Sequence, residues 1–469
     1  MEINGAKMFV KALQEEGVDT LFAYPGGTAI DLFDALYDAE GIDMILPRHE
    51  QALVHAADGY ARSTGRVGVC LVTSGPGATN LVTGIATANY DSVPLVCFTG
   101  QVPMNLIGND AFQEVDIVGI TRSICKYAVT VRKREDLARI IKNAFYIART
   151  GKPGPVVVDI PKDIQLAMGS DEYPTEVNIR GYKPSEGVHV GQIKRALAEL
   201  KNAKKPVFLC GGGVNIAHAR KEMQELAEKT GIPVVTTIMG KGAIPTDHPL
   251  YVGNIGMHGN MASNKAIMES DVLFSIGCRF NDRITGTIDT FAKNAKIIHV
   301  DIDAASISRN IKVDIPIVAD AKVAISKMLE YAEPLDIKGW VDDIMNVKAE
   351  YPINMNRYDG VTPEAIIRTI NDMYSNLIVT TDVGQNQLWT TQYIDIDENK
   401  QLLTSGGLGT MGYGLGAALG AKMGKKDKKV FNIAGDGCFR MNMNEIATAT
   451  RYNIPIIEVI INNLSLIHI

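Results

Sequence analysis

The 469-residue sequence contains no apolar run of 18 residues, and its N-terminus has no charged n-region, apolar h-region or Arg- and Ser-rich leader. These absences predict a protein without a membrane span and give no support to secretion or organelle import. Positive charge is not in excess, since 47 Lys and Arg stand against 53 Asp and Glu for a net charge of −6. Because phosphate backbones are bound by a basic face, this balance argues against a nucleic-acid partner.

The six cysteines include no Cys-x-x-Cys pair, and most of them lie in apolar, strand-like runs. Scattered thiols fit a reducing cytoplasm better than a disulfide framework or a zinc site, so we interpret them as small core residues. The apolar and charged fractions, 46% and 21%, exclude disordered and collagen-like classes. A chain of this length is expected to fold into two to four domains.

Apolar, strand-like runs alternate with helical patterns through most of the chain. This alternation predicts parallel sheets covered by helices, which is an α/β fold. Strands are expected at 20–25, 67–73 and 94–100, at 206–214, 232–237, 271–277 and 296–303, and at 376–384 and 429–437, with a Gly-rich helix over 409–424. Polar stretches at 167–190 and 346–362 are interpreted as linkers. We therefore predict three parallel-sheet α/β domains, at 1–166, 191–345 and 363–469.

The first and third predicted domains contain similar segments. Each has a strand, a Gly-x-Gly turn, a helix with the letters "IATA", a proline and another strand. Gly75 and Pro94 are 19 positions apart, and Gly435 and Pro455 are 20 positions apart. Agreement in this register predicts two related domains on either side of a different one.

The turn "AGDG" in the third domain has the composition of a metal and diphosphate site. Gly435 and Gly437 would let backbone N–H groups approach a phosphate at a helix N-terminus, and Asp436 offers a hard oxygen ligand. Asn463 follows 27 positions later, just past the next predicted strand, so it is expected at the same sheet edge. Oxygen ligands bridged to diphosphate are typical of Mg²⁺.

Motifs along nearly the whole chain resemble the large, catalytic subunits of the acetolactate synthase (acetohydroxyacid synthase) family. They include "YPGG" (24–27), "RHEQALVHAADGYAR" (48–62), "TSGPGATN" (73–80), "GMHG" (256–259), "RFNDRITG" (279–286) and "GGLGTMGYGLGAALGA" (406–421). The resemblance implies the thiamin diphosphate-binding fold. The first domain would bind the cofactor's pyrimidine, the central domain FAD, and the third thiamin diphosphate with Mg²⁺.

The resemblance also implies roles for single residues. Glu50 is the carboxylate that faces N1′ of the aminopyrimidine and shares its proton, a task suited to a dry pocket. Met411 holds the cofactor in its bent form, and the Pro25–Gly27 loop covers the reacting carbon. The residues implied on the substrate side are Phe112, Gln113, Lys162 and Arg283, of which Arg283 would receive the carboxylate of the second 2-oxo acid.

The implied metal ligands are Asp436, Asn463 and the backbone carbonyl of Ser465. The implied flavin contacts are Gly211, Gly212, Gly213, Met257, His258 and Asp301, together with Lys152 of the first domain. "GGGV" alone is weak because it is not GxGxxG, but "GMHG" and an acid-ended strand add support for a nucleotide along strand ends. The family often carries Arg where Lys152 stands, so this contact is expected to be weaker.

The activity implied by the resemblance is a carboligation. Pyruvate loses CO₂, and the remaining two-carbon unit joins a second 2-oxo acid, pyruvate or 2-oxobutanoate, to give 2-acetolactate or 2-aceto-2-hydroxybutanoate for branched-chain amino acid biosynthesis. A homodimer or tetramer with a small regulatory subunit is also implied. The alternatives are another thiamin diphosphate enzyme of the same superfamily, of the pyruvate oxidase or decarboxylase type, and an inactive fragment.

The fragment alternative depends on the last residues of the sequence. After "NN" the family continues into a helix and a lid, whereas "LSLIHI" matches neither. We therefore expect a C-terminally truncated third domain and poor activity of this exact chain, with an apolar edge strand that invites aggregation.

Overall fold

The computed structural model describes residues 1–355 and 360–463. Its chain divides into two compact units, one made of Met1–Lys183, Ile378–Asn386 and the residues from Leu403 onward, the other of Pro184–Leu377 and Gln387–Leu402. Three sheets of four to six strands, in which the strand pairs with a defined register are parallel, confirm the predicted α/β class. In the described ranges, no helix combines the length and the apolar character that a membrane span requires.

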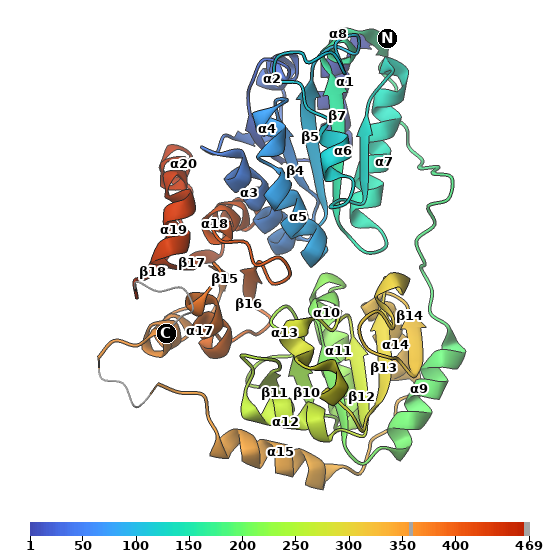
Figure 1. The fold of residues 1–469 in the computed structure, drawn as a ribbon, viewed down its shortest axis with the longest axis vertical. Helices are drawn as coiled ribbons and strands as arrows, with labels where there is room; N and C mark the ends of the chain where they lie inside the picture. Colours follow the sequence, from blue (N-terminus) through green and yellow to red (C-terminus); the bar gives the residue numbers. More distant parts are fainter. Residues whose placement is uncertain (356–359, 464–469) are drawn as a thin grey trace. The chain divides into compact units, whose positions relative to one another are not determined.

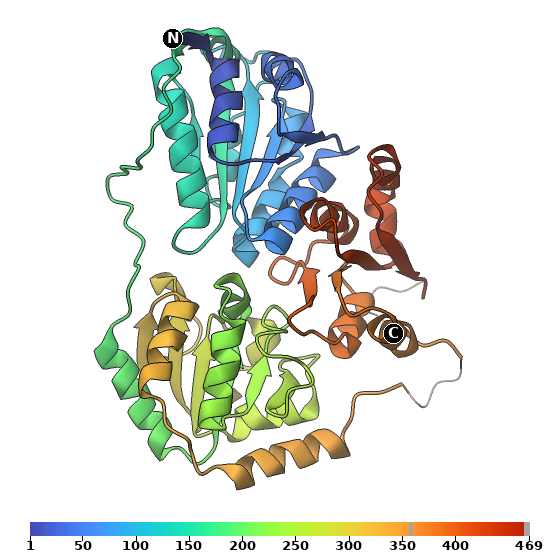
Figure 2. The ribbon, with the colours of Figure 1, turned by 180° about the vertical axis from the view of Figure 1, so that it is seen from behind.

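The first sheet of unit 1 has six parallel strands. Their order is β3 (Asp43–Ile45), β2 (Thr20–Tyr24), β4 (Gly68–Val72), β5 (Leu95–Gln101), β7 (Pro155–Pro161) and β6 (Tyr127–Thr130). Helices α1 (Gly5–Glu15), α2 (Ile30–Tyr37) and α7 (Leu137–Arg149) share one buried core with this sheet, and α3 (Glu50–Thr64) and α5 (Val82–Asp91) share another (Figures 1 and 2). The sheet is therefore covered on both faces, as parallel sheets require.

Shorter elements complete this part of unit 1. They are β1 (Glu2–Asn4), β8 (Met168–Ser170), α4 (Pro76–Thr79), α6 (Ile117–Thr121), α8 (Lys162–Leu166) and one 3₁₀ turn at Arg134–Asp136. Strand β8 lies in the stretch 167–190 that we interpreted as a linker, and it pairs antiparallel with β1. A three-residue strand has too little periodicity to be recognised in the sequence. Its partner strand lies more than 160 residues away, so the local sequence gives no signal for the pairing either.

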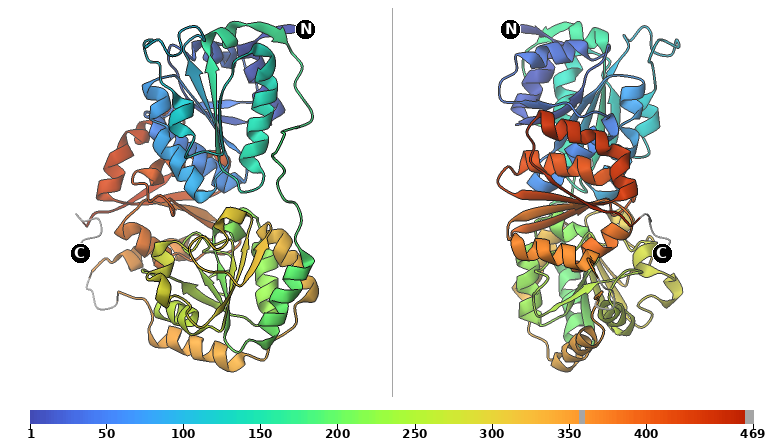
Figure 3. Two further views of the ribbon diagram at one scale, coloured as in Figure 1. Left: turned by 45° about the vertical axis from the view of Figure 1, so that its right-hand side comes forward. Right: turned by 90° about the vertical axis from the view of Figure 1, so that its left-hand side faces the viewer.

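A second, four-stranded sheet contains the repeated segment. Its order is β16 (Lys400–Thr404), β15 (Leu377–Thr381), β17 (Lys429–Gly435) and β18 (Ile457–Ile461). Helices α18 (Tyr413–Gly424), α19 (Asp436–Asn442) and α20 (Ile446–Arg451) and the 3₁₀ turn η4 (Met443–Glu445) accompany it (Figure 3). The order β16-β15-β17-β18 repeats the order β3-β2-β4-β5, which supports the predicted relation between the two domains.

Two glycines let α3 and α18 pack backbone to backbone within unit 1. A Cβ on Gly59 would come 2.1 Å from the carbonyl oxygen of Ala417, and a Cβ on Gly420 would come 1.7 Å from that of Ala56. Real Cβ atoms do not approach backbone so closely, so only glycine fits at either position.

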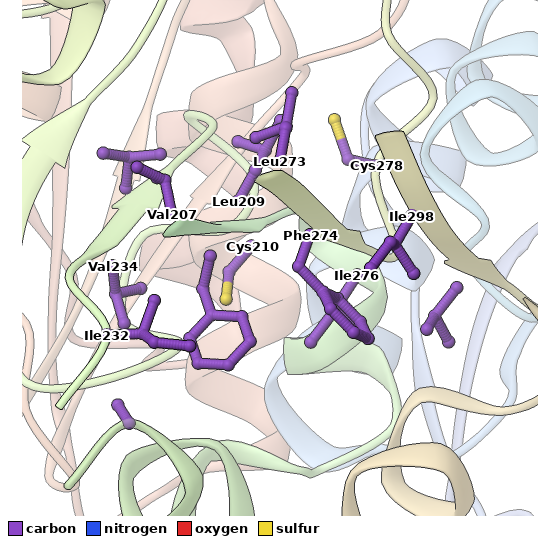
Figure 4. Close-up of a cluster of buried hydrophobic side chains, with 14 of the residues drawn as sticks. Val207, Leu209, Cys210, Ile232, Val234, Leu273, Phe274, Ile276, Cys278 and Ile298 are labelled. Atoms are coloured by element: carbon purple, nitrogen blue, oxygen red, sulfur yellow. The ribbon is translucent and has the colours of Figure 1, made fainter. Parts of the chain in front are cut away.

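Unit 2 is built around a six-stranded parallel sheet. Its order is β11 (Tyr251–Asn254), β10 (Val234–Thr236), β9 (Pro206–Cys210), β12 (Val272–Ile276), β13 (Lys296–Asp301) and β14 (Ile315–Val318). The central strands β9 and β12 are largely apolar because both faces of the sheet are covered. Figure 4 shows Val207, Leu209, Phe274 and Ile276 of this core, all fully buried.

The helices around this sheet are α9 (Val190–Asn202), α10 (Gly212–Ile216), α11 (Arg220–Thr230), α12 (Met261–Glu269), α13 (Asp282–Thr285), α14 (Ala321–Tyr331) and α15 (Lys338–Glu350), with 3₁₀ turns at Ile288–Thr290 and Ala304–Ser306. Helix α16 (Pro363–Met373) and most of α17 (Gln385–Tyr393) also belong to unit 2. Helix α15 continues through residues 346–350, which we had placed in the second linker. The domain boundaries themselves stay predictions.

All six cysteines are free, and five of them are buried. Cys125, the exception, is partly buried. This agrees with their interpretation as small core residues, and Cys210 and Cys278 are seen among the core side chains of Figure 4.

Candidate active site

The carboxyl ends of β17 and β18 bring together the polar residues predicted for the third domain. The two strands are parallel, with Gly435 opposite Ile461, so Asp436 and Asn463 follow them at the same sheet edge. Asp436 is the first residue of α19, and the amide nitrogen of Asn463 donates a hydrogen bond to the side-chain oxygen of Gln385. Gln385 was not among the predicted site residues, although an amide directly after the predicted strand that ends in "TTDVG" was the available signal.

This edge has the donor set that a magnesium diphosphate would need. The side chains are the carboxylate of Asp436 and the amide of Asn463, both of which offer hard oxygen ligands. The described residues contain no cluster of three His, Cys, Asp or Glu side chains that could hold a metal. Gly435 precedes α19 without a side-chain cap, and a Cβ on Gly437 would meet no atom within 4 Å. The N-terminus of α19 therefore leaves room for a phosphate. Ser465, the third predicted ligand, lies outside the described residues.

The segment before α18 is a loop and not the start of a helix. We predicted a helix over 409–424, but α18 begins at Tyr413, because Gly409 and Gly412 have left-handed φ angles of 71° and 83°. Met411 is partly buried in this loop. The carboxylate of Asp382, whose pKa is raised by burial, accepts hydrogen bonds from the backbone of Gly412 at 2.8 Å and Gly414 at 3.1 Å.

Glu50 begins α3 and is partly buried. The imidazole of His49 caps the helix by accepting from the backbone N–H of Gln51, and the side-chain amide of Asn80 donates to a Glu50 carboxylate oxygen at 3.0 Å. Asn80 follows α4, so the turn after β4 orients the carboxylate that follows β3. Asn80 lies in the motif "TSGPGATN", but no role was predicted for it.

Hydroxyl groups fix the Pro25–Gly27 loop after β2. The Thr28 hydroxyl lies 3.0 Å from the hydroxyls of Thr73 and Ser74, which follow the neighbouring parallel strand β4. A Cβ on Gly26 would come 2.5 Å from Thr73, whereas a Cβ on Gly27 would meet nothing within 4 Å. Gly26 is thus needed for the close approach of the two turns, and Gly27 faces open space.

Lys162 joins this loop, and Phe112 does not contribute to the packed structure. Lys162 begins α8, and its ammonium group lies 3.3 Å from the carbonyl oxygen of Gly27 and 3.5 Å from Asp31. The Phe112 residue is 87% exposed. Gln113 has a left-handed φ of 60° and lies with its backbone against Gly75, where a Cβ would come 2.9 Å from the Gln113 oxygen.

In unit 2, the predicted flavin residues follow the carboxyl ends of the strands. A Cβ on Gly211 would come 2.1 Å from the carbonyl oxygen of Gly277, and one on Gly213 would come 2.6 Å from the Cα of Gly277. Glycine is therefore required where the turns after β9 and β12 touch, while Gly212 faces Met239. Asp301 ends β13 and is buried, and its carboxylate accepts from the backbone of Asp303 at 2.8 Å.

The "GMHG" turn contacts the segment that carries Arg283. The backbone N–H of Met257 donates to the carbonyl oxygen of Arg283 at 3.0 Å, and burial together with the Arg283 charge lowers the pKa of His258. The Met257 residue and the Arg283 side chain are 64% and 69% exposed, so both are open to solvent in this unit.

Lys152 lies apart from the other predicted residues of unit 1. It precedes β7, so it stands at the amino end of that strand, whereas Glu50 and the Pro25–Gly27 loop stand at the carboxyl edge. Burial and the charge of Lys152 lower the pKa of Lys126 to about 8.

Three protein-family models match the chain. They are the N-terminal TPP binding domain of thiamine pyrophosphate (thiamin diphosphate) enzymes at residues 3–120, the central domain at 193–328 and the C-terminal TPP binding domain at 382–468.

Curated relatives match almost the whole chain. A probable acetolactate synthase large subunit of Methanococcus aeolicus is 48% identical over 99% of this chain and 81% of its own length. The acetolactate synthase large subunit of Corynebacterium glutamicum is 47% identical over 98% of this chain and 75% of its own length. The acetolactate synthase isozyme 3 large subunit of Escherichia coli is 45% identical over 98% and 82%.

Proposed function

This chain belongs to the acetolactate synthase large-subunit family of thiamine pyrophosphate enzymes, and from this membership we propose how its residues perform the reaction. The activity is the carboligation that opens branched-chain amino acid biosynthesis, with loss of CO₂ from pyruvate. The observation that carries the residue assignments is the shared sheet edge of Asp436 and Asn463, with Gln385 beside them. When bound, thiamine pyrophosphate supplies the electron sink for decarboxylation.

We propose that the third domain holds the diphosphate with Mg²⁺. Asp436 and Asn463 would supply oxygen ligands, and the backbone N–H groups at Gly435 and Gly437 would donate hydrogen bonds to phosphate oxygens. Because the Asn463 amide nitrogen donates to Gln385, the amide is oriented with its oxygen as the ligand atom. Met411, placed before the left-handed Gly412, would supply apolar support for the cofactor.

Glu50 is proposed to hold the proton that the pyrimidine nitrogen shares. A carboxylate in this role must keep one oxygen fixed while the other exchanges a proton, and the hydrogen bond from Asn80 at 3.0 Å fixes one oxygen.

The substrate side is proposed to consist of Gly26, Gly27, Phe112, Gln113, Lys162 and Arg283. The contact of Lys162 with the Gly27 carbonyl places a positive charge on the loop, where a 2-oxo acid carboxylate would arrive. Arg283 offers a bidentate fork on an exposed side chain for the carboxylate of the second 2-oxo acid.

FAD is proposed to bind along the strand ends of the central domain. Gly211 and Gly213 let the turns after β9 and β12 meet at one edge of the sheet, and Asp301 ends a strand at the same edge. Gly212, Met257 and His258 complete this edge, and Lys152 of the first domain is the remaining proposed contact.

Pyruvate as substrate and a small regulatory subunit as partner follow from membership in the large-subunit family. We propose 2-oxobutanoate as an alternative second substrate and a homodimer or tetramer as the assembly. A cytoplasmic location is also proposed, with support from the six free cysteines.

The test is the formation of acetolactate from pyruvate by purified chain with thiamin diphosphate, Mg²⁺ and FAD. Glu50→Gln should lower the rate at least 100-fold, in the range of general acid–base catalysis. The matched control is Glu176→Gln, an exposed glutamate, which should leave the rate unchanged. Equal rates for Glu50→Gln and the parent would refute the role of Glu50, and reduction of the flavin by pyruvate would indicate an oxidase instead.

A further inference from the structure

The segment 405–412, here called the Met411 loop, joins β16 to α18 and has little conformational preference of its own. It contains two glycines with left-handed φ angles, Gly409 and Gly412, and no regular secondary structure. Its conformation must therefore be set by what contacts it. Within unit 1, side chains of α3 and α5 contact its beginning, its middle and the residue after its end.

The beginning of the Met411 loop is held by a buried ion pair. Arg62 donates to the carbonyl oxygen of Thr404 at 3.0 Å and to Asp91 at 2.9 Å, and the same Asp91 oxygen accepts from the backbone N–H of Gly406 at 3.1 Å. The side chains of Arg62 and Asp91 are 10% and 1% exposed. Arg62 and Asp91 thus hold Thr404, directly before the loop, and Gly406, its second residue.

Two further contacts hold the middle and the end. The hydroxyls of Thr87 and Thr410 lie 2.7 Å apart, and both residues are buried. The Tyr413 hydroxyl donates to Asp58 at 2.7 Å, and the same carboxylate oxygen accepts from Arg62 at 2.6 Å. Met411 therefore lies between Thr410 and Tyr413, two residues that are held by side chains of the first domain.

A buried ion pair of this kind costs desolvation and is a weak device for stability. An apolar contact between the helices and the loop would serve stability at least as well. What the hydrogen-bonded pair adds is direction, since it fixes the carbonyl of Thr404 and the N–H of Gly406 at once.

Resting on the proposed function, we propose that Arg62, Asp91 and Thr87 are positioning residues for thiamin diphosphate, which act by fixing the Met411 loop of their own chain. None of the three is among the residues proposed above to contact substrate or cofactor. Their loss lets Met411 move, so the cofactor binds less tightly and its two rings are held less often in the reactive geometry.

The test compares Arg62→Met and Thr87→Val with Arg66→Met in the full chain. Arg66 is the matched control because it follows α3, pairs with Asp19 and has a side chain that is 46% exposed. Affinity for thiamin diphosphate with Mg²⁺ is measured by calorimetry, and the exchange of the cofactor's C2 proton for deuterium is measured by NMR at saturating cofactor. Urea midpoints report on folding.

Arg62→Met should weaken cofactor binding and slow C2 exchange at least tenfold, and Thr87→Val should slow exchange three- to tenfold with an unchanged urea midpoint. Arg66→Met should stay within twofold of the parent. If Arg62→Met does not fold, Thr87→Val decides. Exchange within twofold of the parent at saturation in the folded variants would overturn the proposal. A parent that binds the cofactor without accelerating exchange would instead refute the proposed function. The affinities would then decide the positioning role: weaker cofactor binding by Arg62→Met than by Arg66→Met would support it, and equal binding would overturn it.

Discussion

Replacing Gly420 by alanine should destabilise unit 1, because α3 and α18 leave no space for a methyl group there. The new Cβ would lie 1.7 Å from the carbonyl oxygen of Ala56, 2.6 Å from its carbon and 2.9 Å from the nitrogen of Tyr60. All three atoms belong to the backbone of α3 and cannot rotate away. The closest pair must therefore separate to about 3 Å, which moves one helix against the other.

Two effects of opposite sign determine the size of the change. Alanine is a better helix former than glycine by about 0.5–1 kcal/mol, which would stabilise the variant. Overpacking costs about 1–3 kcal/mol and more where the obstacle is rigid. We expect a net loss of about 2 kcal/mol, which lowers the ratio of folded to unfolded protein roughly 30-fold.

Gly339→Ala is the matched control. Gly339 lies in α15, is exposed, and its Cβ would meet no atom within 4 Å, so only the helix-forming gain applies. Urea unfolding followed by circular dichroism should show a lower midpoint for Gly420→Ala and an equal or higher one for Gly339→Ala. A midpoint for Gly420→Ala at or above that of the parent would refute the close packing of α3 and α18.

Three further predictions concern titration, metal and assembly. Burial raises the pKa of Asp159 to about 6, so its stabilising contribution of about 2–3 kcal/mol is present below pH 4 and is lost as the pH rises through 6. The urea midpoint of the parent should therefore fall between pH 4 and 6, and that of Asp159→Asn should fall less. An equally steep fall in the variant would contradict this. Asp436→Asn and Asn463→Ala should remove at least tenfold of the cofactor affinity in Mg²⁺ but little in EDTA, by calorimetry; equal losses in both would exclude a metal role. Mixing Glu50→Gln and Asp436→Asn chains should restore about a quarter of the parent rate if each site is shared by two subunits, whereas a mixture no better than its components would place the site within one chain.

The features that could be predicted from the sequence are those with a local signal. The repeated strand, turn, helix, proline and strand are found at β4 to β5 and at β17 to β18, and in both cases the two strands are parallel neighbours. The repeat even retains the break in its helix, as α4 and α5 in one copy and α19 and α20 in the other. Apolar runs and turn residues are enough for this, because each element's type depends mostly on its own residues.

Backbone conformation and long-range contacts could not be predicted in this way. Gly409 and Gly412 read as part of a Gly-rich helix, and only their φ angles show that the helix starts at Tyr413. Arg62 and Asp91 belong to quoted motifs or lie near them, but their contacts with Thr404 and Gly406 join residues more than 300 positions apart. Such contacts leave no periodic pattern in either segment.

The support of Glu50 illustrates how far such contacts reach. The carboxylate of Glu445 is fully buried and accepts from the backbone N–H groups of Arg48 at 2.9 Å and His49 at 3.0 Å, the two residues before Glu50. Burial raises the pKa of Glu445. The hydrogen bonds from the N–H groups of Arg48 and His49 and from the Thr448 hydroxyl, the last at 2.6 Å, offset the cost of burying the carboxylate. Glu445 ends the ten-residue segment that begins with Asp436, so the proposed metal ligand and the start of α3 are held by one short stretch of chain. The motifs that contain Glu50 and Asp436 are therefore parts of one packed structure, and a substitution in either is expected to alter the position of the other.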